Sequence, residues 1–165
     1  MSANPMDEVS NSSILQEMSG LFQKSCCRQS VGRMRSLSIG FGVRIPHLKK
    51  NLPDSFYGEW ELGTYTSAWR IVRQRHVLCG SQNVVDSIAE LDAGLNSIEL
   101  GQVVSVCAIS ELDVRVDLDD GTRVEFLGAS SGEDELFHVF GPNNLYVEYS
   151  MTKGWRIGKS NVPWA

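Results

Sequence analysis

The chain has 165 residues, of which 42% are hydrophobic and 21% are charged, and its formal net charge is -5. A chain of this size and composition can bury a core of its own as a single domain, which excludes collagen-like, low-complexity and wholly disordered proteins. No apolar run approaches the roughly 18 residues of a membrane span. The polar N-terminus lacks the apolar segment of a secretory signal, so we expect a cytoplasmic protein with no membrane partner.

The charges are divided unevenly along the chain. Residues 1–80 carry a formal charge of +4, from 10 Lys and Arg against 6 Asp and Glu. Residues 81–165 carry -9, from 5 Lys and Arg against 14 Asp and Glu. Such a separation bears on partners and association rates rather than on fold, and the acidic half argues against nucleic acid as the partner.

The N-terminal third contains one predicted helix. Residues 1–12 are predicted to be a flexible tail. Residues 13–26 place Ile14, Met18 and Leu21 at helical spacing, and the basic segment 27–35 is predicted to be a connector. The region 13–35 is therefore expected to be a helix and connector that precede the β-rich domain at 36–165.

From Leu37 the apolar residues alternate with a period of two, which indicates strands. We expect one strand at 37–43, with a bulge near its glycines. Two more lie within 56–80 and are joined by a turn at 73–76. After a predicted helix at 83–95, further strands are expected at 98–109, 113–118, 122–127, 136–140, 145–150 and 155–158.

Short turns separate the later strands, at Asp120-Gly121 and at Gly141–Asn144, and such turns favour antiparallel pairing. The prediction is an α+β fold in which two helices pack on a single twisted meander of roughly seven to nine strands, mostly antiparallel. Within 113–127, apolar residues share one face of the hairpin while Arg, Asp and Glu share the other. This alternation predicts a solvated face of mixed charge.

No residue pattern in the chain supports catalysis, and we expect neither enzymatic activity, nor a cofactor, nor a metal site. His47, His76 and His138 lie in no known catalytic or metal-binding motif. The four cysteines have no metal-ligand spacing and are expected to be reduced thiols. The densest carboxylates lie at turns, where solvation keeps carboxyl groups ionised.

Carboxylates at turns are a candidate surface for a basic protein partner, since they steer association and aromatic side chains can anchor the complex. The candidate residues of this acidic patch and its anchors are Asp119, Asp120, Glu133, Asp134, Glu135, Phe137 and Tyr146. An alternative face for a small ligand or nucleic acid lies in the strand pair 60–76 and comprises Trp60, Trp69, Arg70 and Arg73.

The segments LSIGFG, SAWRIVRQRHVLCGSQN, LGQVVSV, DVRVDLDDGTRVEFLG and ELFHVFGPNNLYVEYSMTKGW, within residues 37–158, resemble a family of small bacterial domains of unknown function. Some members are suspected immunity proteins of interbacterial toxin systems. The resemblance implies a non-enzymatic protein that neutralises a toxin by direct binding, and the acidic patch favours a basic toxin domain as the partner. A ligand-binding or nucleic-acid-binding accessory domain stays open as the alternative, and so does a homodimer.

Overall fold

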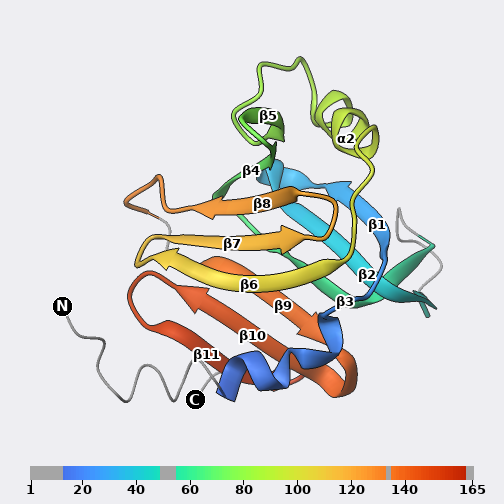
Figure 1. The fold of residues 1–165 in the computed structure, drawn as a ribbon, viewed down its shortest axis with the longest axis vertical. Helices are drawn as coiled ribbons and strands as arrows, with labels where there is room; N and C mark the ends of the chain where they lie inside the picture. The colour runs from blue at the N-terminus through green and yellow to red at the C-terminus, as the bar shows by residue number, and fades with distance from the viewer. Residues whose placement is uncertain (1–12, 49–54, 133–134, 163–165) are drawn as a thin grey trace.

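The structure is a computed structural model that describes residues 13–48, 55–132 and 135–162. These residues form eleven strands in two sheets, and every strand pair is antiparallel (Figure 1). In spatial order, sheet A contains β1 (Cys26–Val31), β2 (Leu37–Pro46), β3 (Phe56–Thr64), β9 (Glu135–Gly141), β10 (Leu145–Ser150) and β11 (Gly154–Lys159). Sheet B contains β5 (His76–Gly80), β4 (Ala68–Arg73), β8 (Thr122–Leu127), β7 (Asp113–Leu118) and β6 (Val103–Ser110).

The antiparallel, β-rich character is confirmed, but the prediction of one meander sheet is wrong. The chain leaves sheet A after β3 to form β4, and it returns from β8 to form β9. Strands β3 and β9 therefore pair with each other in sheet A, while β4 and β8 pair in sheet B. Alternation along a strand reports which side chains face inward, but it does not report which sheet the strand joins.

The two sheets face each other, and their inward side chains form the core. The ring centroids of Phe126 on β8 and Phe137 on β9 lie 4.9 Å apart across the interface. Trp69 and Ile71 on β4 and Leu62 on β3 are also almost completely buried. The alternation predicted within β7 and β8 is confirmed, since Val114, Val116, Val124 and Phe126 are all 0% exposed.

The N-terminal helix is shorter than predicted. Residues 13–17 are helical, a 3-10 turn (η1) follows at Ser19–Leu21, and Gln23 takes a positive φ of 65°. A Cβ at Gly20 would lie 2.9 Å from the Trp60 ring, so the chain turns where its backbone meets this indole. Met18 and Leu21 are 0% exposed, and this segment is therefore part of the core.

The predicted connector at 27–35 is instead the edge strand β1, followed by a 3-10 turn (η2) at Arg33–Arg35. Its polar side chains conceal the strand pattern because their partners lie far away in the sequence. Arg28 pairs with Glu61, and Gln29 Nε2 donates hydrogen bonds of 3.0 Å to the carbonyls of Leu95 and Ile98.

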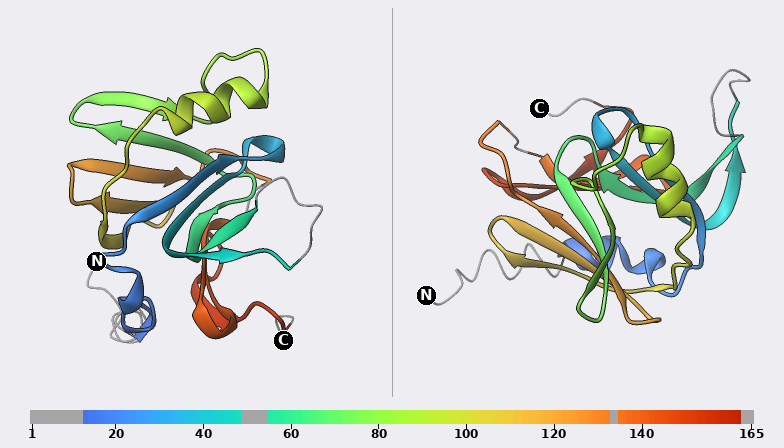
Figure 2. Two further views of the ribbon diagram at one scale, coloured as in Figure 1. Left: turned by 90° about the vertical axis from the view of Figure 1, so that its right-hand side faces the viewer. Right: turned by 90° about the horizontal axis from the view of Figure 1, so that it is seen from above.

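The second helix, α2 (Ile88–Asn96), begins five residues later than predicted. Its N-cap is Ser87, whose hydroxyl accepts a 3.1 Å hydrogen bond from the Glu90 amide, and Glu90 Oε2 accepts one of 2.9 Å from the Asp86 amide. This arrangement resembles a capping box, and the Ser87-x-x-Glu90 spacing was the sequence signal for it. Figure 2 shows α2 lying against β1, with Leu91 and Leu95 buried.

Two turn predictions are confirmed. Strand β2 has a bulge between Phe41 and Arg44, where Gly42 takes a φ of +89°. Pro142–Asn144 forms a 3-10 turn (η3) between β9 and β10. Among the described residues, no helix combines the length and apolar character needed to cross a membrane.

Candidate functional site

The predicted acidic patch is not a single surface. Asp119 and Asp120 are exposed at the β7–β8 turn, where their carboxylates accept hydrogen bonds from nearby backbone amides. Glu135 follows the opposite end of β8, a strand of six residues that spans about 20 Å. Glu133 and Asp134 lie outside the described residues. The described acidic candidates are therefore divided between two ends of the molecule.

Three of the predicted aromatic residues belong to the core instead of the surface. Phe137 is 0% exposed and packs on Phe126. Trp60 and Trp69 are also buried, and the Trp69 indole nitrogen donates a 2.8 Å hydrogen bond to the Arg35 carbonyl. Phe137 is not available to anchor a partner, and the two tryptophans are not available to stack on a ligand.

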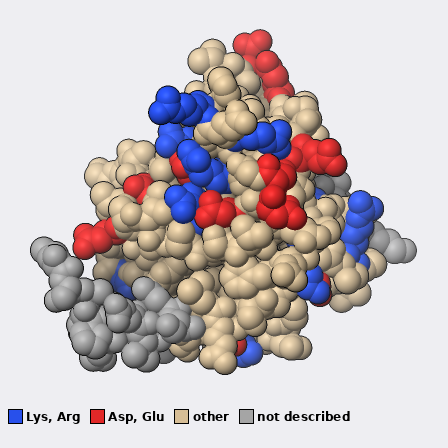
Figure 3. Space-filling view, viewed as in Figure 1, with Lys and Arg blue, Asp and Glu red and all other residues tan. Residues whose placement is uncertain are grey.

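Arg70 lies on the outer face of sheet B, whereas Arg73 lies at the end of β4 on the same side as the buried Thr122, and both arginines make ion pairs. Arg70 and Arg123 both donate to the Glu125 carboxylate, and Arg73 lies 3.5 Å from Asp120 Oδ2. Burial raises the pKa of Glu125, but the hydrogen bonds and charges of the two arginines outweigh it and leave the pKa below its ordinary value. Figure 3 shows basic and acidic side chains interspersed here, which confirms the predicted face of mixed charge.

Glu135 and Tyr146 come together on the outer face of sheet A, around a histidine that the sequence analysis had set aside. His138 is 5% exposed, and its Nδ1 lies 2.8 Å from Glu135 Oε1. Its ring centroid lies 4.4 Å from that of Tyr65 and 6.4 Å from that of Tyr146. With Glu148, which pairs with His138 across β9 and β10, these residues form what we call the His138 cluster.

The cluster forms where the chain passes between the sheets. Tyr65 follows β3, at the departure from sheet A, and Glu135 opens β9, at the return. Glu135 Oε2 accepts hydrogen bonds from the Tyr65 amide at 3.3 Å and from Thr64 Oγ1 at 3.4 Å. Because β3 and β9 are neighbours in sheet A, residues 70 positions apart in sequence meet at one point.

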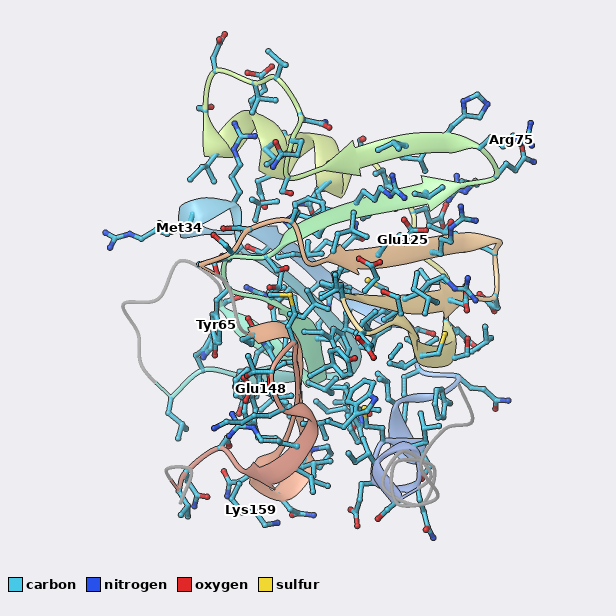
Figure 4. All side chains as sticks on the ribbon, turned by 90° about the vertical axis from the view of Figure 1, so that its left-hand side faces the viewer. Met34, Tyr65, Arg75, Glu125, Glu148 and Lys159 are labelled. Carbon is cyan, nitrogen blue, oxygen red and sulfur yellow. The ribbon has the colours of Figure 1, made fainter. Side chains whose placement is uncertain are left out.

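Buried carboxylates line this outer face, and each has a cationic partner. Glu148 is 7% exposed, and its Oε2 accepts a 2.8 Å hydrogen bond from Arg156. Glu61 accepts hydrogen bonds from Arg28 at 3.3 Å, from the Ser38 hydroxyl at 2.9 Å and from a backbone amide at 2.8 Å. Pairing of this kind is what allows a charge to remain buried. Figure 4 shows Tyr65 and Glu148 on one flank, well away from Glu125 and Arg75 on sheet B.

The two tyrosines of the cluster are held in the protonated form. Burial raises the pKa of Tyr146, and the negative charge of Glu148 raises it further. Burial and the charge of Glu135 raise the pKa of Tyr65 in the same way. Near neutral pH both phenols are therefore hydrogen-bond donors as well as apolar surfaces.

A glycine makes room for the buried ion pair of this face. A Cβ at Gly40 would lie 2.8 Å from Glu61 Oε1 and 3.1 Å from the Arg28 Cβ. Gly40 lies on β2 between these residues, opposite Arg28 on β1 and Glu61 on β3. The absence of a side chain at this position thus lets the two charged groups meet above the sheet.

The His138–Glu135 pair is the arrangement by which a carboxylate orients an imidazole as a base. Among the described residues, no Ser, Thr or Cys side chain makes a hydrogen bond to His138. Within the same residues, no group of three or more His, Cys, Asp and Glu side chains could hold a metal ion. The described side chains thus supply an oriented imidazole without a nucleophile bonded to it.

A cavity of about 470 Å³ adjoins the His138 cluster, within the size range of small-ligand sites. It lies between β3 and the η3 turn, and Phe140 belongs to both the cavity wall and the aromatic contacts of the cluster. The other walls include Ile45, Tyr57, Glu59, Glu61 and Pro142.

Sequence reasoning missed most of this face because it expected outward side chains to be solvated. His138 was found in no catalytic or metal-binding motif, and Glu61 and Glu148, which alternate with buried apolar residues, were not considered as site residues. One available signal was a charged or imidazole group flanked on both sides by large apolar residues, as in Phe137-His138-Val139 and Val147-Glu148-Tyr149.

Comparisons of this chain with protein-family models, with curated proteins and with solved structures find no match.

Proposed function

We propose that this protein is a non-enzymatic binding module, an immunity protein that neutralises a bacterial toxin by direct contact, and that it binds through the outer face of sheet A. The observation that carries the proposal is the set of partly exposed tyrosines Tyr57, Tyr65 and Tyr146 on this face, around the cavity and the buried carboxylates. Tyrosine is enriched among the residues that dominate binding energy at protein interfaces.

The pre-formed geometry of this face supports the same proposal. Tyr65 is tied to Glu135 through its backbone amide and rests on the His138 ring, so ordering this side chain on binding costs little entropy. The outer face of sheet B supports it less well, because its cations are already paired with Glu125 and Asp117.

The test begins with a search for a toxin reading frame beside the gene and continues with co-expression of that candidate toxin, with growth as the readout. We expect wild-type protein to protect the cells and Tyr65→Ala to protect them less. With the purified toxin, we expect Tyr65→Ala to shorten the lifetime of the complex. The matched control is Arg75→Ala, an exposed residue at the β4–β5 turn of sheet B, which should protect as wild type does. Equal protection by Tyr65→Ala and wild type would remove this face from the interface.

A nucleic-acid-binding or ligand-binding accessory domain is the second candidate. The observation that favours it is the gathering of Arg70, Arg115 and Arg123 on the outer face of sheet B, with Arg73 and Arg75 at the end of β4. We expect any oligonucleotide binding at low salt to weaken when Arg70 and Arg73 are replaced by Ala. Absence of binding at low salt would dispose of this candidate.

A further inference from the structure

The cavity beside the His138 cluster carries a charge pattern that selects a cation. Among the described residues that line it, Glu59 and Glu61 are charged and no Lys, Arg or His is present. The cations that pair with these carboxylates, Lys24 and Arg28, are not among the cavity's lining residues. Negative charge therefore borders the empty volume without an intervening positive group.

The two carboxylates differ in how well they are satisfied. Glu61 accepts hydrogen bonds from Arg28, Ser38 and a backbone amide, so its charge is fully engaged. Glu59 accepts no hydrogen bond within the described residues, and its buried Oε1 is unsatisfied. Lys24 Nζ lies 3.2 Å from this oxygen as an ion pair, in an orientation that makes no hydrogen bond.

An ionised carboxylate can accept about four hydrogen bonds, and leaving a partly buried one without any is costly. The Glu59 side chain is 21% exposed, and among the described residues its one cationic neighbour is Lys24, so its carboxylate is only partly hydrated and can accept further donors. Because Oε1 is closed to solvent, a cationic donor that enters the cavity would approach Glu59 from the exposed side of its side chain and add to the charge of Lys24.

The remaining walls fit a flat cation on an apolar stem. Tyr57 and Phe140 offer aromatic rings, while Ile45 and Pro142 offer aliphatic surface. A guanidinium group is planar, weakly hydrated and able to stack on an aromatic ring while it donates to a carboxylate. The methylene stem of an arginine packs on apolar walls in the same way.

We infer that this cavity receives an arginine side chain of the bound partner, with its guanidinium donating to Glu59 between the rings of Tyr57 and Phe140. The inference rests on the proposed function, since it names the group by which the partner is recognised. It also gives a chemical reason for a basic partner. The net charge of the chain alone does not show where on the surface such a partner would bind.

A titration of the full chain with N-acetyl-arginine amide tests the inference without any partner protein. We expect saturable shifts of the backbone amide signals of Tyr57, Glu59 and Asn143 in NMR spectra. N-acetyl-citrulline amide has nearly the same shape without the charge, and we expect it to bind at least about tenfold more weakly, as for one lost charged hydrogen bond.

The variant that isolates the carboxylate is Glu59→Gln, which we expect to weaken the arginine probe about tenfold and to leave the citrulline probe unchanged. Glu99→Gln, an exposed position outside the cavity, is the matched control and should bind both probes as wild type does. If Glu59→Gln alters the fold, Tyr57→Leu gives a second measure by removing one ring, with a loss of several-fold. Equal binding of the two probes, or an unchanged affinity in Glu59→Gln, would overturn the inference.

The toxin assay then separates the two proposals. Wild-type protein that fails to protect contradicts the proposed function, whereas the probe titration still decides what the cavity binds. Protection that is equal in wild type and Glu59→Gln contradicts an arginine in the cavity while the binding function stands.

Discussion

The outer faces of the two sheets follow the same alternation but have different surroundings. On sheet B, the side chains of Arg70, Arg115 and Arg123 are between 37% and 46% exposed, and they pair with the buried Glu125 or with Asp117, which is 29% exposed. On sheet A, Glu61, His138 and Glu148 are all less than 10% exposed. The comparison teaches that an outward-facing position in a strand does not imply solvation, because tyrosines and arginines can fold over the polar groups beside them.

This difference also separates two roles for charge. In the ion pairs of sheet B the arginine side chain is partly exposed, and a solvent-exposed pair such as Arg115–Asp117 contributes about 0–1 kcal/mol. The ion pairs of sheet A are buried next to aromatic rings and a cavity, where removing one partner leaves the other charge uncompensated. The first arrangement tolerates change, and the second holds side chains in fixed positions.

The largest contrast is expected between Glu61→Ala on sheet A and Asp117→Ala on sheet B. Glu61→Ala removes the buried carboxylate that accepts from Arg28, Ser38 and a backbone amide, and should lower the free energy of unfolding by about 2–4 kcal/mol. The Asp117 carboxylate lies 3.1 Å from Arg115, and its side chain is 29% exposed. Asp117→Ala should therefore lower the free energy of unfolding by less than about 1 kcal/mol. Urea unfolding of both variants measures the difference, and equal losses would break the comparison.

A second contrast uses two glycines. Gly40→Ala places a methyl group against Glu61 and Arg28, and should cost about 1–3 kcal/mol as the pair is pushed apart. Gly94→Ala is the control, since nothing lies within 4 Å of a Cβ in this α2 position, and it should stabilise by up to about 1 kcal/mol. A neutral Gly40→Ala would mean that the Arg28–Glu61 pair moves freely, contrary to a fixed outer face.

The contribution of the Glu125 ion pairs on sheet B to stability should depend on pH in the acid range. Because the pKa of folded Glu125 lies below its ordinary value of about 4.3, its ionisation stabilises the fold above that pH, and this stability is lost as pH falls through the lowered pKa. Glu125→Gln should therefore lower the free energy of unfolding by about 1 kcal/mol at pH 7 and by less at pH 3. A wild-type-to-variant difference that is constant over this range would contradict the assignment.

The smallest effect concerns the sheet A tyrosines in alkali. The raised pKa of folded Tyr146 means that the fold favours the neutral phenol, so stability is complete below about pH 10 and is lost as pH rises above it. Tyr146→Phe removes this ionisation. Between pH 9 and pH 11, the Tm of this variant should therefore fall by about 2 °C less than the Tm of the wild-type protein. Parallel declines of Tm in the two proteins would show that Tyr146 is solvated.

Much of the strand content could be predicted because it depends on residues that are close together in the sequence. The bounds of β7, β8 and β10 agree with the predicted ranges, since alternation and the turns at Asp120-Gly121 and Gly141–Asn144 define them. Strand β1 could not be predicted in this way, because Arg28 and Gln29 find their partners on β3 and beside α2. Of the candidate site, Glu135 and Tyr146 were named for charge and aromaticity, while the histidine between them was passed over.

The sequence by itself determined the antiparallel strands, their inward residues and the mixed-charge face of sheet B, because a period of two and short turns are properties of neighbouring residues. Only the tertiary structure decided that there are two sheets, that Phe137, Trp60 and Trp69 are core, and that Tyr65, Glu135, His138 and Tyr146 meet. The physical reason is the double crossing of the chain, which pairs β3 with β9 and brings distant residues to one face.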